Sequence, residues 1–134
     1  MNYAEISKET ISLLIKSYES LKNSPLNSTI RVLVELRTSQ MNGCEYCIRL
    51  HTKEAMQIHV PEEKIKELSS WKKSAHFSEK EIAALSWCES VTQLDKHLER
   101  KALSPYFSER EIVDLTAAIS IMNALTRLSI SLKN

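Results

Sequence analysis

The chain has 134 residues with 18 basic and 17 acidic side chains, so its formal net charge is +1. This length fits one domain, residues 1–134, and the balanced charge provides no strong field for nucleic acid or an anionic membrane. Apolar runs of only a few residues argue against a membrane-spanning helix. One glycine and three prolines are too few for the turns of a sheet-rich fold, so the composition predicts an all-α protein.

The first half of the chain predicts four helices, over 2–23, 27–42, 44–59 and from Pro61 through PEEKIKELSSW. Asn2 and Glu5 have the spacing of a capping box for the first helix. The second helix is apolar nearly all round, which predicts a buried position. Gly43 ends it, because glycine adopts the left-handed conformation without strain. Proline and the glutamates that follow it suit the first turn of the fourth helix.

The second half of the chain contains a repeat, in which FSEKEIAAL at 77–85 returns as FSEREIVDL at 107–115. Each copy has a serine followed three residues later by a glutamate. This is the spacing of a capping box, so each copy predicts the start of a long helix. The two helices are expected over 78–100 and 108–131, as an antiparallel pair rather than an array of repeats. About six helices are expected in total.

The stretch MNGCEYCIRLH, residues 41–51, concentrates the reactive side chains. The chain begins without the basic and apolar pattern of a secretory signal, so we expect a cytoplasmic protein, where cysteines are seldom structural disulfides. In a helix, Cys44, Cys47 and His51 share one face. The first turn of a helix favours thiolates, which attack peroxide oxygens or oxidised sulfurs, and a nearby imidazole can exchange the proton. The pattern therefore predicts redox chemistry.

Either cysteine could be the attacking thiol. The helix start favours Cys44, whereas proximity to His51 favours Cys47, and we choose Cys47 because proton exchange requires the closer contact. We expect a reversible Cys44–Cys47 disulfide and a Cys88 that stays reduced as a core thiol. Glu35 has two interpretations: most such glutamates are solvated, but its place in an otherwise apolar helix is also typical of a paired carboxyl group.

Two alternative interpretations use the same cysteines. CxxCxxxH offers three zinc ligands, which would describe a non-enzymatic zinc-binding or redox-sensing module. The fourth ligand would have to come from Cys88, His59, His76 or His97, and none of these stands in a second zinc motif. A thioredoxin-like strand before a CxxC helix is the other alternative, but the rest of the chain supplies no sheet. We therefore expect no metal and no cofactor.

The segment LVELRTSQMNGCEYCIRLHTKEA resembles the core of the alkylhydroperoxidase D (AhpD)-like branch of the carboxymuconolactone decarboxylase family. The similarity extends to FSEKEIAALSW and to FSEREIVDLTAAISIMNALTRLSI, and so covers roughly residues 25 to 131. The resemblance implies an all-helical fold that assembles as a homo-oligomer, often a trimer or hexamer. It also implies thiol-dependent reduction of hydroperoxides, with a dithiol reductant to recycle the enzyme. Lactone decarboxylases of the same superfamily lack the cysteine pair, which makes decarboxylation the weaker inference.

The same resemblance assigns roles to individual residues. Cys47 is the attacking thiol, Cys44 resolves the product, and His51 belongs to a proton relay. Family members usually carry a relay glutamate about twelve residues before the first cysteine, and this chain has Val32 there. Glu35 lies one helical turn further on, so it is the candidate to reach the same site.

Overall fold

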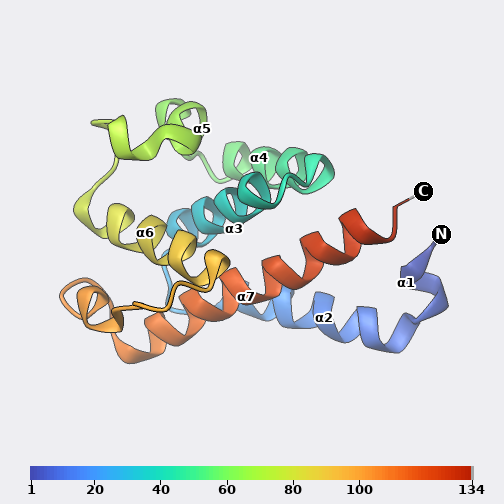
Figure 1. Ribbon diagram of the computed structural model, residues 1–134. Coiled ribbons are helices and arrows are strands. Elements are labelled where there is room, and N and C mark those ends of the chain that lie inside the picture. The colour runs from blue at the N-terminus through green and yellow to red at the C-terminus, as the bar shows by residue number, and fades with distance from the viewer. Residues whose placement is uncertain (134) are drawn as a thin grey trace.

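The computed structural model describes residues 1–133 of the chain, and it is all-helical over that range (Figure 1). Its seven α-helices are α1 (Tyr3–Ile6), α2 (Lys8–Ser20), α3 (Ser28–Asn42), α4 (Glu45–Gln57), α5 (Glu62–Glu67), α6 (Glu79–Gln93) and α7 (Glu109–Ser131). Short 3-10 helices lie at Leu21–Asn23, Leu68–Lys73 and Arg100–Leu103. The predicted all-α fold is confirmed, with short helices beyond the six expected.

Helix α3 is the central element of the fold. Every residue from Ile30 to Leu36 is buried, as the apolar sequence of this helix predicts. The Asn27 side chain caps its start by accepting a hydrogen bond from the Ile30 amide. Gly43 ends it in the left-handed conformation, with φ 67°. The chain can therefore turn sharply and begin α4 beside α3.

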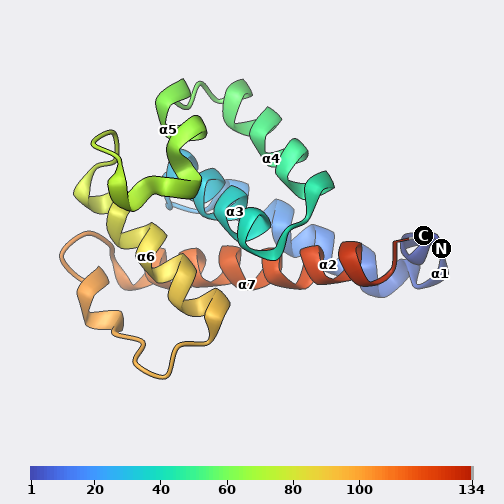
Figure 2. The ribbon, with the colours of Figure 1, turned by 45° about the horizontal axis from the view of Figure 1, so that its top comes forward.

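Two apolar cores lie on either side of α3. One joins α3 to α6 and α7 and includes Val34, Leu115 and Ile119. The other joins α3 to α4 and the segment after α5, and it includes Leu33 and Leu68. Figures 1 and 2 show the result, with α4 and α5 on one side of α3 and α7 with α2 on the other. The carboxyl end of α7 thereby lies near the start of α4.

The internal repeat starts two helices in the same way. Ser78 and Glu81 form a complete capping box at the start of α6, and Ser108 and Glu111 form the equivalent box at the start of α7. In each box the serine side chain accepts from the glutamate amide, and the glutamate side chain accepts from the serine amide. Helices α6 and α7 also pack against each other. The predicted antiparallel arrangement is wrong, because the segment between them returns along α6 and both helices run in similar directions (Figure 1).

The first predicted helix is broken. Asn2 makes no side-chain capping bond, and Ser7 (φ −120°, ψ 60°) interrupts the helix between α1 and α2. The predicted Asn2–Glu5 capping box is therefore wrong. The reason is a lack of packing, because α1 buries none of its residues and the first buried side chain of this region is Ile11.

The helix predicted over 78–100 is too long. Helix α6 ends at Gln93, and Leu94 adopts the left-handed conformation with φ 54°. Residues 93–102 are all exposed, so no apolar face holds this segment against the core as a helix. The other predicted ends agree with the structure to within two residues, except that 3-10 helices continue both α2 and α5.

Helix α7 is the one helix among residues 1–133 that is long and apolar enough to cross a membrane by length and composition. The short apolar runs in the sequence did not reveal this. The helix nevertheless packs against α2, α3 and α6, and its residues Ile112, Leu115, Ala118 and Ile119 belong to the core that joins α3 to α6 and α7. It also carries charged side chains, among them Asp114 and Arg127. We therefore interpret α7 as a packed helix of the bundle.

Candidate active site

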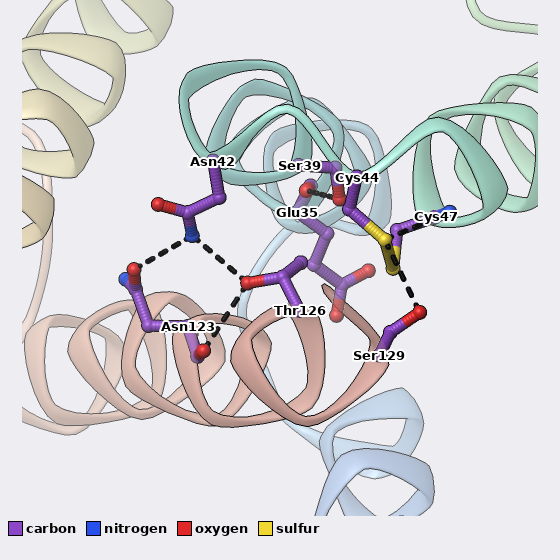
Figure 3. The surroundings of a disulfide bond; sticks show 8 residues. All are labelled: Glu35, Ser39, Asn42, Cys44, Cys47, Asn123, Thr126 and Ser129. Atoms are coloured by element: carbon purple, nitrogen blue, oxygen red, sulfur yellow. Dashed lines mark hydrogen bonds between the residues drawn. A yellow bond between two sulfur atoms is a disulfide. The ribbon is translucent and has the colours of Figure 1, made fainter. Parts of the chain in front are cut away.

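The two cysteines lie where the chain enters α4. Cys44 is the N-cap residue, and its Sγ accepts a hydrogen bond from the amide of Cys47 at 3.4 Å. Cys44 and Cys47 form a disulfide with their Cα atoms 5.3 Å apart. Figure 3 shows this disulfide between the end of α3 and the last turns of α7, where Cys44 Sγ lies 3.6 Å from Ser129 Oγ. The predicted pairing is thus the one in the structure, and Cys88 is free.

A pocket of about 320 Å³ gives access to Cys47 and His51. Helices α1, α2, α4 and α7 supply its walls. Most of the side chains that line it are apolar, among them Ile11, Leu50 and Met122. The Tyr18 ring meets the His51 ring edge-on, with the ring centroids 5.9 Å apart. Cys47 and His51 therefore share one largely apolar opening.

Behind His51 lies a buried cluster of charged and polar side chains from three helices. Arg31 Nη1 donates to Glu35 Oε1 at 2.9 Å and to Glu54 Oε1 at 3.2 Å. Tyr18 Oη donates to Glu54 Oε2 at 2.9 Å. The same Glu54 oxygen lies 3.4 Å from His51 Nδ1. We call Tyr18, Arg31, Glu35 and Glu54 the charge cluster. It links α2, α3 and α4 to the imidazole.

The two carboxyl groups of the charge cluster differ in ionisation. Burial raises the pKa of Glu35 to about 8, against a partial opposing effect of Arg31. Contact with His51, helped by the Tyr18 hydroxyl and Arg31, lowers the pKa of Glu54 to about 2. Burial and the nearby carboxylates raise the pKa of Tyr18 well above its usual value. At neutral pH the cluster thus holds one carboxylate, one guanidinium and a protonated Glu35.

Two buried atoms of this region lack a hydrogen bond within the described residues, Glu35 Oε2 and His51 Nδ1. The 3.4 Å contact between His51 and Glu54 is close enough for electrostatic attraction but is not aligned as a hydrogen bond. Ligand atoms of Glu35, His51 and Glu54 all lie within 4.8 Å of one another. The three groups are therefore close enough to interact electrostatically, and a proton would pass between Glu35 and His51 through a bridging water.

The same three side chains have the composition of a cation site. Arg31, however, already bonds both carboxyl groups and supplies the positive charge that a metal ion would bring. The alternative CxxCxxxH zinc site would need both cysteines as thiolates, and in this structure they form a disulfide. The suggested fourth ligands do not join it, because Cys88 lies in the other core and His59, His76 and His97 are exposed.

Each residue predicted for the site can now be placed. Cys44, Cys47 and His51 come together as the helical spacing predicts. Glu35, fully buried, reaches the cluster behind His51, whereas Val32 packs in the apolar core next to α4. The acid that contacts this site from α3 is therefore Glu35, one turn away from the usual family position.

The sequence did not single out Tyr18, Arg31 or Glu54. Tyr18 was read as part of an apolar stripe, and a tyrosine in a stripe gives no sign that its hydroxyl is bonded. Two spacings are those of side chains in contact on a helix: Glu54 follows His51 by three residues, and Glu35 follows Arg31 by four. Such pairs are also common on solvated helix faces. Only the packing of α2, α3 and α4 shows that these two pairs form one cluster.

A profile of the carboxymuconolactone decarboxylase family matches residues 13–90, more than half of the chain. The chain belongs to this family. The matched region contains α3, the cysteine pair, His51 and the whole charge cluster. Family membership therefore covers the site as well as the fold.

The chain is also similar to individual proteins. It is 32% identical over 138 residues to YdfG of Bacillus subtilis, an uncharacterized protein, covering 100% of this chain and 94% of that one. The crystal structure of ATU0492 from Agrobacterium tumefaciens, a protein of unknown function provisionally assigned to antioxidant defence as AhpD, is 31% identical with a TM-score of 0.91, covering 98% and 92%. The apo debrominase Bmp8 shares the fold at 20% identity and a TM-score of 0.83, covering 95% and 70%. The AhpD-like fold is thereby shown.

Proposed function

We propose that this protein is a thiol-dependent peroxidase that reduces organic hydroperoxides through a Cys44–Cys47 disulfide cycle, in an antioxidant role in the cytoplasm. The observation that carries the proposal is the shared pocket of Cys47 and His51. One partner of the disulfide lies beside an imidazole at an apolar opening, and the other is positioned to close the bond. Neither feature is needed for a decarboxylase, so the cysteine pair favours redox chemistry.

The proposed cycle consists of oxidation of Cys47, resolution by Cys44 and reduction of the disulfide. The Cys47 thiolate attacks the terminal oxygen of the hydroperoxide, the O–O bond breaks, and the alcohol leaves with a proton. Cys47 is then a sulfenic acid. The Cys44 thiol attacks that sulfur, forms the disulfide and releases water. A dithiol reductant returns two electrons and two protons and is itself oxidised to a disulfide.

Proton supply is the role proposed for His51 and Glu35. The leaving alcohol needs a proton, and the imidazole at the pocket is the group placed to give it. The carboxyl of Glu35 holds its proton up to a pH of about 8 and lies within 4.8 Å of His51. Glu35 thus provides a reserve proton behind the imidazole.

We also propose that the protein is a homo-oligomer, a trimer or hexamer as the family resemblance implies. Only 33% of the most apolar stretch of α7 is buried within one chain. Partly exposed apolar side chains outside the two cysteine pockets include Ile121 and Leu128. A second copy of the chain would cover them. Light scattering tests this, and a monomer at micromolar concentration would contradict it.

The peroxidase proposal is tested with a single turnover. Protein reduced and freed of reductant receives one equivalent of cumene hydroperoxide under anaerobic conditions. We expect one cumyl alcohol per chain and the loss of two thiols, located by peptide mapping at Cys44 and Cys47. The control is the double variant Cys44→Ser/Cys47→Ser, which keeps Cys88. Alcohol formation as slow as in this control would overturn the proposal, and stoichiometric zinc in the reduced protein would favour the metal-binding alternative.

A further inference from the structure

The two cysteines of the disulfide line different pockets. Cys47 lines the apolar pocket described above. Cys44 lines a second pocket of about 310 Å³, formed by the start of α4 and the end of α7. Tyr46 and Ser129 line both pockets, so the two pockets are neighbours. Each cysteine therefore has a pocket of its own.

The two pockets also differ in chemistry. Two basic side chains, Arg49 and Lys133, line the pocket at Cys44, with one acidic side chain, Glu45. Both basic residues are exposed, and no carboxylate among residues 1–133 forms an ion pair with Arg49. The pocket at Cys47 is mostly apolar. A pocket with a surplus positive charge next to a reducible sulfur is suited to an anionic thiol.

We propose that the pocket at Cys44 is the entry site of the reductant, and that it selects a small dithiol that bears a carboxylate. The inference rests on the proposed disulfide cycle and adds to it a separate site for the second substrate. The hydroperoxide reaches Cys47 through the apolar pocket, and the reductant reaches Cys44 through the basic one. The pocket volume fits a small molecule rather than a protein segment.

The reductive step follows from this placement. The reductant thiolate attacks Cys44 Sγ, a mixed disulfide forms at Cys44, and the Cys44–Cys47 bond breaks. Cys47 leaves as the thiolate, next to the imidazole of His51 that can protonate it. The second thiolate of the reductant then attacks the reductant sulfur of the mixed disulfide, and Cys44 leaves as a thiolate that takes a proton from solvent. Two thiols are oxidised to one disulfide, and the protein gains two electrons.

Attack at Cys44 also suits the next cycle. Departure of Cys47 leaves the attacking thiol free in its own pocket, beside His51.

The test measures reduction of the oxidised protein without any hydroperoxide. Three monothiols of similar size are compared at equal thiolate concentration: 3-mercaptopropionate, 2-mercaptoethanol and cysteamine. The ratio of the anionic to the cationic rate is the readout. We expect Arg49→Gln to lower this ratio by roughly two- to five-fold, the size of effect of one exposed charge, and added salt to lower it in the wild type. Lys53→Gln on α4 removes the same charge outside this pocket and is the matched control.

A second measurement locates the attack. Acid quenching followed by fragmentation of the peptide that contains both cysteines should place the mixed disulfide on Cys44. An adduct on Cys47, or equal ratios in the Arg49→Gln and Lys53→Gln proteins, overturns the proposal. The proposed peroxidase activity is judged separately. A protein that shows the charge preference but makes no alcohol from cumene hydroperoxide keeps this reductant site and loses that function.

Discussion

Cys47 and Cys88 are both buried cysteines, yet they differ in their access to a pocket and in the groups beside the sulfur. Cys88 is fully buried in the core that joins α3 to α6 and α7, where Thr38 Oγ1 lies 3.2 Å from its Sγ. Burial raises the pKa of Cys88 to about 11. Cys47 is 6% exposed, lines a pocket and lies within one helical turn of His51. Reactivity therefore depends on a route for the substrate and on a partner for the proton rather than on burial.

Of all the substitutions, Cys47→Ser should lower hydroperoxide turnover the most. We expect no measurable hydroperoxide turnover, because no other thiol has both the pocket and the imidazole. Cys88→Ser should keep turnover close to that of the wild type. Alcohol formation is the measurement for both proteins. Normal turnover in the Cys47→Ser protein would show that Cys44 attacks, and trapping of the sulfenic acid with a dimedone-type reagent would then locate it.

Removal of the imidazole should have the next largest effect. His51→Ala leaves the cysteine pair in place but removes the group that exchanges protons with Cys47. We expect the rate of the single turnover to fall about 10²-fold, as is typical for the loss of a general acid–base group. His59→Ala, an exposed histidine just after α4, serves as the control. Equal rates in the two variants would mean that water alone supplies the proton.

Loss of the contact between Glu54 and His51 should have a smaller effect on turnover. Glu54→Gln keeps the size of the side chain but removes the negative charge that lies 3.4 Å from His51 Nδ1. We expect turnover to fall about 10-fold, corresponding to about 1.4 kcal/mol. Glu62→Gln on α5 removes an exposed charge elsewhere and should leave turnover unchanged. The same 10-fold loss in a His51→Ala background would show that Glu54 does not act through His51.

Much of the scaffold could be predicted because the signals are local. The serine–glutamate boxes specify the starts of α6 and α7, Gly43 specifies the turn before α4, and the apolar sequence of α3 specifies its burial. The break at Ser7 and the early end of α6 could not be predicted. They depend on whether a segment finds a surface to pack against, and the sequence of that segment does not contain this information.

The candidate site likewise has a part that the sequence predicts and a part that it does not. Cys44, Cys47 and His51 lie on one helix, so the helical period is enough to bring them together. The charge cluster needs three helices at particular angles, and its members have no common period in the sequence. Glu35 could be named because a carboxyl in an apolar helix is unusual. Its partner Arg31 could not be predicted, because an arginine is normally exposed and nothing in the sequence shows that this one is buried.

The last prediction concerns Glu35 and the pH dependence of stability. Unfolded Glu35 loses its proton near pH 4.5, whereas the folded protein keeps it up to about pH 8. Between these values the folded state binds more protons than the unfolded state, so this group makes stability fall as pH rises, by at most about 1.4 kcal/mol per pH unit. Glu54 has no such effect in this window, because its pKa is lowered to about 2 and stability from it is lost only in acid.

Glu35→Gln should therefore remove most of this slope. Urea unfolding of the reduced protein at several pH values between about 5.5 and 7.5 gives the free energy of unfolding, and the difference between variant and wild type isolates the contribution of Glu35. Glu62→Gln, an exposed change, should keep the wild-type slope. If Glu35→Gln keeps that slope as well, Glu35 is ionised in the folded protein. The ion pair with Arg31 then outweighs burial, and the reserve proton proposed behind His51 does not exist.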